Sequence, residues 1–261
     1  MTKGDVLRVL MGQMAIVWGD SAGNLARARE VISEGARRGC DLVLLPECLD
    51  VGWTHPRAAD LAEPVPGPHF EPLAGAAREN GVWVVAGLTE HDGMHTFNAG
   101  VLISPEGRLV LKHRKVNLLD IARPYYTPGD RLAVAETPFG RLGLTICADN
   151  APDALVLGKS LGMMGARAIL SPCAWAVEAD DDGPYGQMWR DAYGELAEQF
   201  SMPVVGVSGV GWMRGGPWEG RKCIGNSLAV DQRGEVVVEG PFGVEAEAMP
   251  VAELALRPPA A

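Results

Sequence analysis

The 261-residue chain is long enough for one large hydrophobic core or two small ones, and 47% of its residues are hydrophobic against 21% charged. This balance excludes an intrinsically disordered chain. The formal net charge of -10, from 33 acidic and 23 basic side chains, repels a phosphate backbone, so we expect no nucleic-acid partner.

The sequence predicts no membrane segment. It lacks the run of about 20 apolar residues that a spanning helix needs. Arg8 and Gln13 interrupt the most apolar part of the N-terminal region, which also lacks the basic flank and cleavage site of a signal peptide. We therefore expect a cytoplasmic protein without membrane contact.

Short apolar runs along the chain predict buried strands, at residues 6–11, 42–45, 82–86, 99–103, 142–146, 168–170 and 204–207. An amphipathic helix is predicted between the first two runs, with Asn24 as its N-cap. Further helices are predicted at residues 70–79, 153–164 and 187–200, and tight turns at 92–93 and 106–107. The layout is mixed α/β, and residues 1–261 are expected to form a single domain.

Three reactive or charged residues directly follow predicted strands. Glu47 follows the run 42–45, Lys115 follows 109–111, and Cys147 follows 142–146. Functional groups in sheets flanked by helices collect beyond the strand ends. These three side chains are therefore candidates for one site.

Cys147 lies where a strand runs directly into a predicted helix with Pro152 in its first turn. The helix dipole is expected to lower the pKa of the thiol, which favours the nucleophilic thiolate. The odd number of cysteines, five, argues against a complete disulfide framework. The competing interpretation of each one is a small buried hydrophobic residue.

Glu47 would be a useful base if it were buried at its strand end, and Lys115 belongs to the basic cluster HRK at residues 113–115. Taken singly, Glu47 also fits a solvated loop acid, and Lys115 also fits a wet surface. The seven tryptophans are expected in the core and in pocket walls. His91 and His95 have a metal-ligand spacing, but Gly93 places a turn between them, so we expect no metal site.

The spaced motifs of the chain resemble those of the nitrilase superfamily, also called carbon–nitrogen hydrolases. They are LLPE at residues 44–47, HRKVNL at 113–118, YTPGD at 126–130, LTICAD at 144–149 and GARAILSPCAW at 165–175. The resemblance implies a four-layer α-β-β-α sandwich that forms a homodimer or a larger homo-oligomer. It implies a triad of Glu47 as general base, Lys115 as electrostatic stabiliser and Cys147 as nucleophile, with no metal or organic cofactor.

The same resemblance implies an amidase that releases ammonia or an amine from a small carboxamide through a cysteine thioester. Ala148, Cys173 and Trp175 would then contact the substrate. An N-carbamoyl-compound hydrolase or a nitrilase with the same triad remains an alternative. A catalytically silent binding protein of the same fold is the alternative outside the enzymes.

Two departures from the family pattern bear on these alternatives. Many relatives carry a second glutamate at the position of Ala122, and the nearest acid here is Asp120. Asp120 is therefore the candidate auxiliary carboxylate, with an exposed loop acid as the competing interpretation. Carbamoylase relatives commonly place an arginine shortly after the cysteine, whereas residues 150–152 contain none, which argues against a carbamoyl amino acid substrate.

Overall fold

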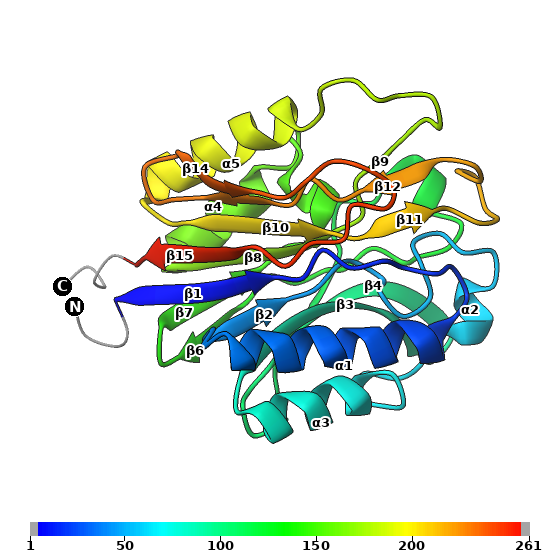
Figure 1. The fold of residues 1–261 in the computed structure, drawn as a ribbon, viewed down its shortest axis with the longest axis horizontal. Coiled ribbons are helices and arrows are strands. Elements are labelled where there is room, and N and C mark those ends of the chain that lie inside the picture. The colour runs from blue at the N-terminus through cyan, green and yellow to red at the C-terminus, as the bar shows by residue number, and fades with distance from the viewer. Residues whose placement is uncertain (1–4, 257–261) are drawn as a thin grey trace.

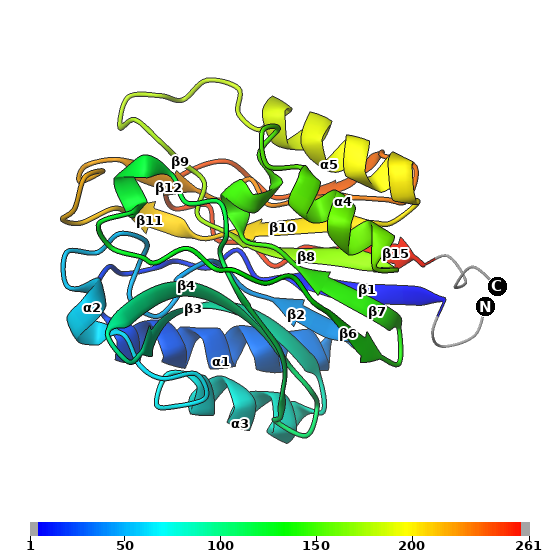
Figure 2. The same ribbon diagram turned by 180° about the vertical axis from the view of Figure 1, so that it is seen from behind.

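The fold, seen in a computed structural model that describes residues 5–256, stacks two six-stranded sheets face to face between two layers of helices (Figure 1). The view from behind shows the same layers (Figure 2). The outer helices are α1 (Ser21–Arg37) and α3 (Phe70–Asn80) on the first sheet, and α4 (Val156–Met163) and α5 (Gln187–Phe200) on the second. The expected four-layer α-β-β-α sandwich is confirmed.

The first sheet has the order β15-β1-β2-β3-β4-β5. Its strands are β1 (Val6–Met11), β2 (Leu42–Leu44), β3 (Trp83–Asp92), β4 (His95–Ile103), β5 (Leu109–Arg114) and β15 (Val251–Ala255). Strands β1, β2 and β3 are parallel, and β4 and β5 continue as antiparallel neighbours. Because β5 thus runs in the same direction as β2, the carboxyl ends of both strands lie at one end of the sheet.

The second sheet has the order β14-β13-β10-β8-β7-β6. Its strands are β6 (Val134–Thr137), β7 (Gly140–Leu144), β8 (Ala168–Cys173), β10 (Val204–Ser208), β13 (Leu228–Val230) and β14 (Val236–Glu239). Strands β7, β8 and β10 are parallel at its centre. A small third sheet joins β9 (Ala176–Val177), β11 (Val210–Trp212) and β12 (Lys222–Ile224), and α2 (Ala58–Leu61) is a single short turn.

Side chains alternate between the two faces of each strand, and this alternation divides the core into three layers. In β1, Val9 and Met11 pack between the two sheets, whereas Leu10 packs with α1. In β8, Leu170 lies between the sheets and Ile169 packs with α5. Successive side chains of a strand point to opposite faces, so a strand covered on both sides must be apolar at every position. This explains the continuous apolar runs of the sequence.

Two helix starts differ from the prediction. The N-cap of α1 is Asp20, whose side chain accepts a hydrogen bond from the N–H of Gly23, while Asn24 lies buried inside the helix and bonds to Val17. Helix α4 begins at Val156 rather than at residue 153, because residues 147–150 form a separate 3-10 turn, η2 (Cys147–Asn150). Pro152 therefore lies between two helical segments.

Within residues 5–256, no helix has the length and apolar character needed to cross a membrane.

Candidate active site

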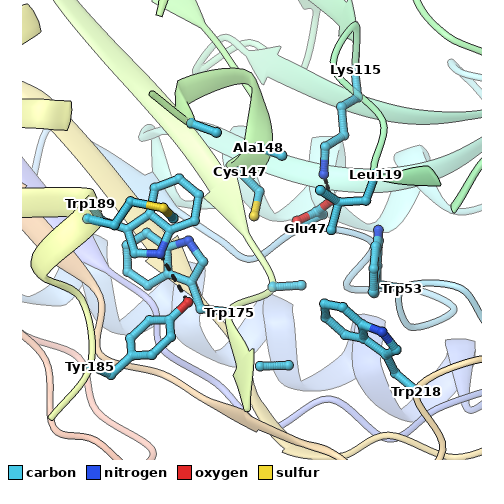
Figure 3. Close-up of a pocket in the computed structure, with 14 residues that line it drawn as sticks. Glu47, Trp53, Lys115, Leu119, Cys147, Ala148, Trp175, Tyr185, Trp189 and Trp218 are labelled. Carbon is cyan, nitrogen blue, oxygen red and sulfur yellow. Dashed lines mark hydrogen bonds and ion pairs between the residues drawn. The ribbon is translucent and has the colours of Figure 1, made fainter. Parts of the chain in front are cut away.

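Glu47, Lys115 and Cys147 line one pocket at the carboxyl ends of β2, β5 and β7 (Figure 3). The cavity has a volume of about 250 Å³. Its lining consists of Glu47, Trp53, Lys115, Leu119, Cys147, Ala148, Ala151, Ala174, Trp175, Ala176, Tyr185, Met188, Trp189 and Trp218. The structure thus brings together the three side chains that the strand ends singled out.

Glu47 and Lys115 form a buried ion pair, with 2.6 Å between Lys115 Nζ and Glu47 Oε1. Asn98 Nδ2 donates to the same carboxylate oxygen, also at 2.6 Å. The other oxygen, Glu47 Oε2, is buried and has no hydrogen-bond partner among residues 5–256. A buried carboxylate oxygen without a hydrogen-bond partner costs free energy, and such atoms are often found where they have a catalytic role. Oε2 is therefore available to accept a proton in the pocket.

Lys115 keeps its positive charge despite its burial. Burial alone lowers the pKa of Lys115, but the negative charge of Glu47 and its hydrogen bond to the ammonium outweigh the effect of burial, so the pKa lies above its ordinary value. The backbone N–H of Lys115 donates to the carbonyl of Asn98 at 2.8 Å, and this bond holds Lys115 against β4. A fixed ammonium therefore stands beside the pocket.

The backbone at Glu47 approaches β3 so closely that only glycine fits opposite it. A Cβ at Gly87 would lie 2.5 Å from the Cα of Glu47, closer than real Cβ atoms come to neighbouring atoms. The N–H of Gly87 donates to the carbonyl of Pro46, and the N–H of Leu49 donates to the carbonyl of Gly87, each at 2.9 Å. These two bonds hold the Glu47 loop against the end of the sheet.

Cys147 occupies a strained turn with φ of 44°, in the left-handed region that non-glycine residues rarely adopt. Its backbone N–H donates to the hydroxyl of Ser171 at 3.1 Å. Asn150 donates to the same hydroxyl at 3.0 Å, so Ser171 links the two ends of η2 to β8. Strain of this kind persists where the surroundings fix the backbone, and it turns the Cys147 sulfur into the pocket (Figure 3).

The expected lowering of the Cys147 pKa is wrong. A hydrogen bond with Cys173, burial and the charge of Glu47 raise the pKa of Cys147 well above its ordinary value, and Lys115 offsets only part of this rise. The predicted helix dipole is missing because η2 is one 3-10 turn and α4 begins only at Val156. The resting thiol is therefore protonated.

Asp149 is a structural residue that the sequence reading missed. It is fully buried next to Cys147 and joins the turn of Cys147 to the segment that follows Lys115. Its partners are the backbone N–H groups of Ile146 (2.9 Å), Val116 (3.0 Å) and Asn117 (2.7 Å), and the ring of His113 (2.8 Å). One carboxylate thus fixes the spacing of both reactive residues, and its place in the motif LTICAD was the available signal.

Aromatic side chains form two walls of the pocket, on either side of Cys147 (Figure 3). On one side, Trp175 stacks on Trp189 with ring centroids 5.3 Å apart, and Trp189 Nε1 donates to the hydroxyl of Tyr185 at 3.0 Å. On the other side, Trp53 and Trp218 meet edge to face at 4.9 Å. The family resemblance singled out Trp175, but the sequence did not indicate that Trp53, Trp189 and Trp218 also line the pocket.

Of the three predicted substrate contacts, two line the pocket and one does not. Ala148 and Trp175 line the pocket. Cys173 is fully buried outside the lining, where its sulfur lies 3.3 Å from the carbonyl oxygen of Ser171 and 3.6 Å from the hydroxyl of Tyr193. Its position supports the wall behind Cys147 and leaves it no contact with a molecule in the pocket.

Asp120 does not reach the pocket. Its side chain is 97% exposed, and its Oδ1 pairs with Arg123 Nε at 3.1 Å. The 3-10 turn η1 (Asp120–Ala122) buries Ala122 and directs Asp120 to solvent. In this structure Asp120 is therefore an exposed loop acid outside the pocket, and the rate of an Asp120→Asn variant tests its role as auxiliary carboxylate.

Asp120→Asn is expected to leave kcat within about twofold of the wild type, since exposed substitutions away from a site change free energies by about 0.5 kcal/mol or less. The rate of ammonia release from an amide measures the effect. A loss of about tenfold or more would show that the loop carries Asp120 into the pocket during turnover.

The part of the chain that the structure describes contains no group of three or more His, Cys, Asp or Glu side chains arranged to hold a metal ion. His91 and His95 lie in the β3–β4 hairpin, where His91 pairs in register with Thr96 and the His95 ring contacts Thr127.

Known proteins similar to this chain include several amidases. Omega-amidase NIT2 of Xenopus tropicalis is 35% identical over 136 residues, which are 48% of this chain and 49% of the relative. The chain thus spans about half the length of the omega-amidases it matches. An (R)-stereoselective amidase of Pseudomonas sp is 32% identical over 235 residues, which are 89% of this chain and 80% of the relative.

Solved structures share the fold. Nit3 of Saccharomyces cerevisiae, a member of branch 10 of the nitrilase superfamily, superposes with a TM-score of 0.81 at 23% identity, over 96% of this chain and 90% of that chain. An amidase from Nesterenkonia sp. gives a TM-score of 0.81 at 21% identity, over 97% and 92%. The carbon-nitrogen hydrolase family model matches residues 8–256. The chain therefore belongs to the carbon–nitrogen hydrolase family.

Proposed function

We propose that this protein is an amidase that hydrolyses small carboxamides through a thioester on Cys147. The observation that carries the proposal is the pocket in which Cys147 faces the Glu47–Lys115 pair, with Glu47 Oε2 left without a partner. The likeness to the (R)-stereoselective amidase over most of the chain supports an amide substrate. The presence of all three reactive side chains in one cavity argues against a catalytically silent binding protein.

In the first half of the reaction, Glu47 Oε2 takes the thiol proton while the sulfur of Cys147 attacks the amide carbon. A protonated resting thiol needs such a base, because only the thiolate is a strong nucleophile. The Lys115 ammonium and the backbone N–H of Ala148 hold the oxyanion that forms. Glu47 then passes its proton to the nitrogen, the carbon–nitrogen bond breaks, ammonia leaves and a thioester remains.

In the second half, Glu47 takes a proton from a water molecule, and the resulting hydroxide attacks the thioester carbon. The carbon–sulfur bond breaks and the Cys147 sulfur regains its proton from Glu47. The sum is one amide and one water converted to one carboxylic acid and one ammonia. Holding the attacking group and the base at fixed positions supplies much of the rate enhancement.

The test is ammonia release from a panel of amides, nitriles and N-carbamoyl compounds. We expect amides to be hydrolysed fastest, because the pocket offers no arginine among its described lining residues for the carboxylate of a carbamoyl amino acid. Faster release from nitriles or from carbamoyl compounds would move the protein to one of the two alternatives that share the triad.

Lys115→Met is expected to lower kcat by about 10²-fold or more while changing KM little, because the ammonium is needed most when the oxyanion forms. Steady-state kinetics on a good amide separate the two constants. Lys112→Met is the matched control, since Lys112 pairs with Glu90 outside the pocket. A change confined to KM would instead assign Lys115 to substrate binding.

We also propose that the protein is a cytoplasmic homodimer. All five cysteines are unpaired in the structure, which suits a reducing compartment. Helix α4 exposes Val156 and Met163 on one face, at 63% and 73%, and a partner subunit would cover such side chains. A monodisperse monomer in light scattering at micromolar concentration would refute the dimer.

A further inference from the structure

The pocket beside Cys147 holds one ion pair and is otherwise uncharged. Of its 14 described lining residues, Glu47 and Lys115 carry charge, and they pair with each other at 2.6 Å. A carboxylate on the substrate would lose its hydration here and would find no cation free of a partner in that lining. Burying an anion without a counter-ion is strongly unfavourable.

The two aromatic walls make the surface of the pocket mainly apolar instead. The rings of Trp175 and Trp189 stack nearly parallel, with 20° between their planes, and together form the wall on one side. Trp53 and Trp218 form the opposite wall, at 60° to each other. An aromatic or branched acyl group placed between these walls is covered on both sides, which favours it over a small or charged one.

The rest of the lining leaves room for such a group. Four alanines contribute to it, at positions 148, 151, 174 and 176. The cavity of about 250 Å³ equals the space of about eight water molecules, each of about 30 Å³. Since bonded atoms lie closer together than neighbouring waters, an amide of about ten heavy atoms suits this volume.

The buried polar groups of the walls that lack a hydrogen-bond partner in the described residues are neutral. Trp53 Nε1 and Trp175 Nε1 are buried and have no hydrogen-bond partner within the described residues. Buried indole N–H groups usually find an acceptor. They can satisfy an oxygen of an uncharged substrate, but they supply no charge that would compensate a carboxylate.

We propose that the enzyme selects uncharged amides with an aromatic or branched apolar acyl group and discriminates against amides whose acyl group ends in a carboxylate. The selection rests on the proposed amidase function and is made by the walls and by the lack of a free cation. Met188, which is 47% exposed in the first turn of α5 and lines the pocket, is the position where a cation would change it.

Three amides test the proposal: phenylacetamide, 4-methylpentanamide and succinamate. The last two have nearly the same shape, because an isopropyl group replaces the carboxylate. We expect kcat/KM for phenylacetamide and for 4-methylpentanamide to exceed that for succinamate by about 10²-fold or more. Equal or faster hydrolysis of succinamate would overturn the selection and leave the amidase function standing, whereas no ammonia from any of the three would overturn both.

A charge variant tests the cause of the selection. Met188→Arg is expected to raise kcat/KM for succinamate relative to 4-methylpentanamide by about tenfold, because an arginine can pair with the substrate carboxylate. Met94→Arg adds the same charge at a 97% exposed turn outside the pocket and should leave the ratio at its wild-type value. An unchanged ratio in Met188→Arg would show that something other than the missing cation excludes carboxylates.

Discussion

Cys147→Ala is expected to lower kcat by at least about 10⁴-fold, because loss of a nucleophile removes the covalent route and leaves only binding and oxyanion stabilisation. The fold should survive, since alanine keeps the Cβ and the backbone bond to Ser171. Ammonia release from the fastest amide of the panel measures the activity, and thermal unfolding checks the fold. Substantial turnover by the alanine variant would refute the thioester mechanism.

Cys40→Ala is the matched control, since Cys40 is also buried but lies outside the pocket, and it should keep wild-type rates. Intact-mass measurement adds a second readout. A slowly hydrolysed substrate should leave its acyl mass on the wild-type protein and on Cys40→Ala, but not on Cys147→Ala. Acyl mass mapped to Cys173 would mean that the neighbouring thiol is the nucleophile.

Glu47→Gln is expected to lower kcat by about 10²- to 10⁴-fold, the range for loss of a general acid–base group. Glutamine keeps the shape of the side chain, but its amide cannot take the thiol proton that Glu47 Oε2 would accept. The change also leaves the Lys115 ammonium without its counter-ion, which costs about 3–5 kcal/mol of stability for a buried pair. Rates must therefore be measured where urea unfolding shows the variant to be folded.

Glu90→Gln separates catalysis from stability. Glu90 is a buried glutamate that pairs with Lys112 and Arg114, outside the pocket. Its substitution should lower stability in a similar way while kcat stays near the wild-type value. If both variants lost activity equally, the loss in Glu47→Gln would reflect packing rather than proton transfer.

Local patterns predicted the central buried strands, and the resemblance carried by the motifs implied the order of the layers. A strand covered on both faces must be apolar at every position, so β1 and β8 are visible as continuous runs. The same patterns placed Glu47 and Cys147 directly after strands, where parallel sheets collect functional groups. Turn chemistry was visible at Gly93, which joins β3 to β4.

Features that depend on solvent exposure, or on contacts between residues distant in the sequence, could not be predicted from the sequence. The sequence made Asp120 a candidate for the pocket, but the η1 turn buries Ala122 and exposes the acid. The Cys147 pKa was predicted in the wrong direction, because it depends on Cys173 and Glu47 rather than on a helix that follows. No local sequence pattern indicates which residues from distant segments contact one another in the folded protein.

The sequence by itself therefore determined the family through its motifs, with the sandwich that the family implies, and it selected the three candidate reactive side chains, since strand periodicity and motif residues are properties of short segments. Only the tertiary structure decided the 2.6 Å contact between Lys115 and Glu47, the cross-link made by Asp149 and the two tryptophan walls. Most of these contacts join segments that are distant along the chain, and their distances and burial exist only after the two sheets have packed together.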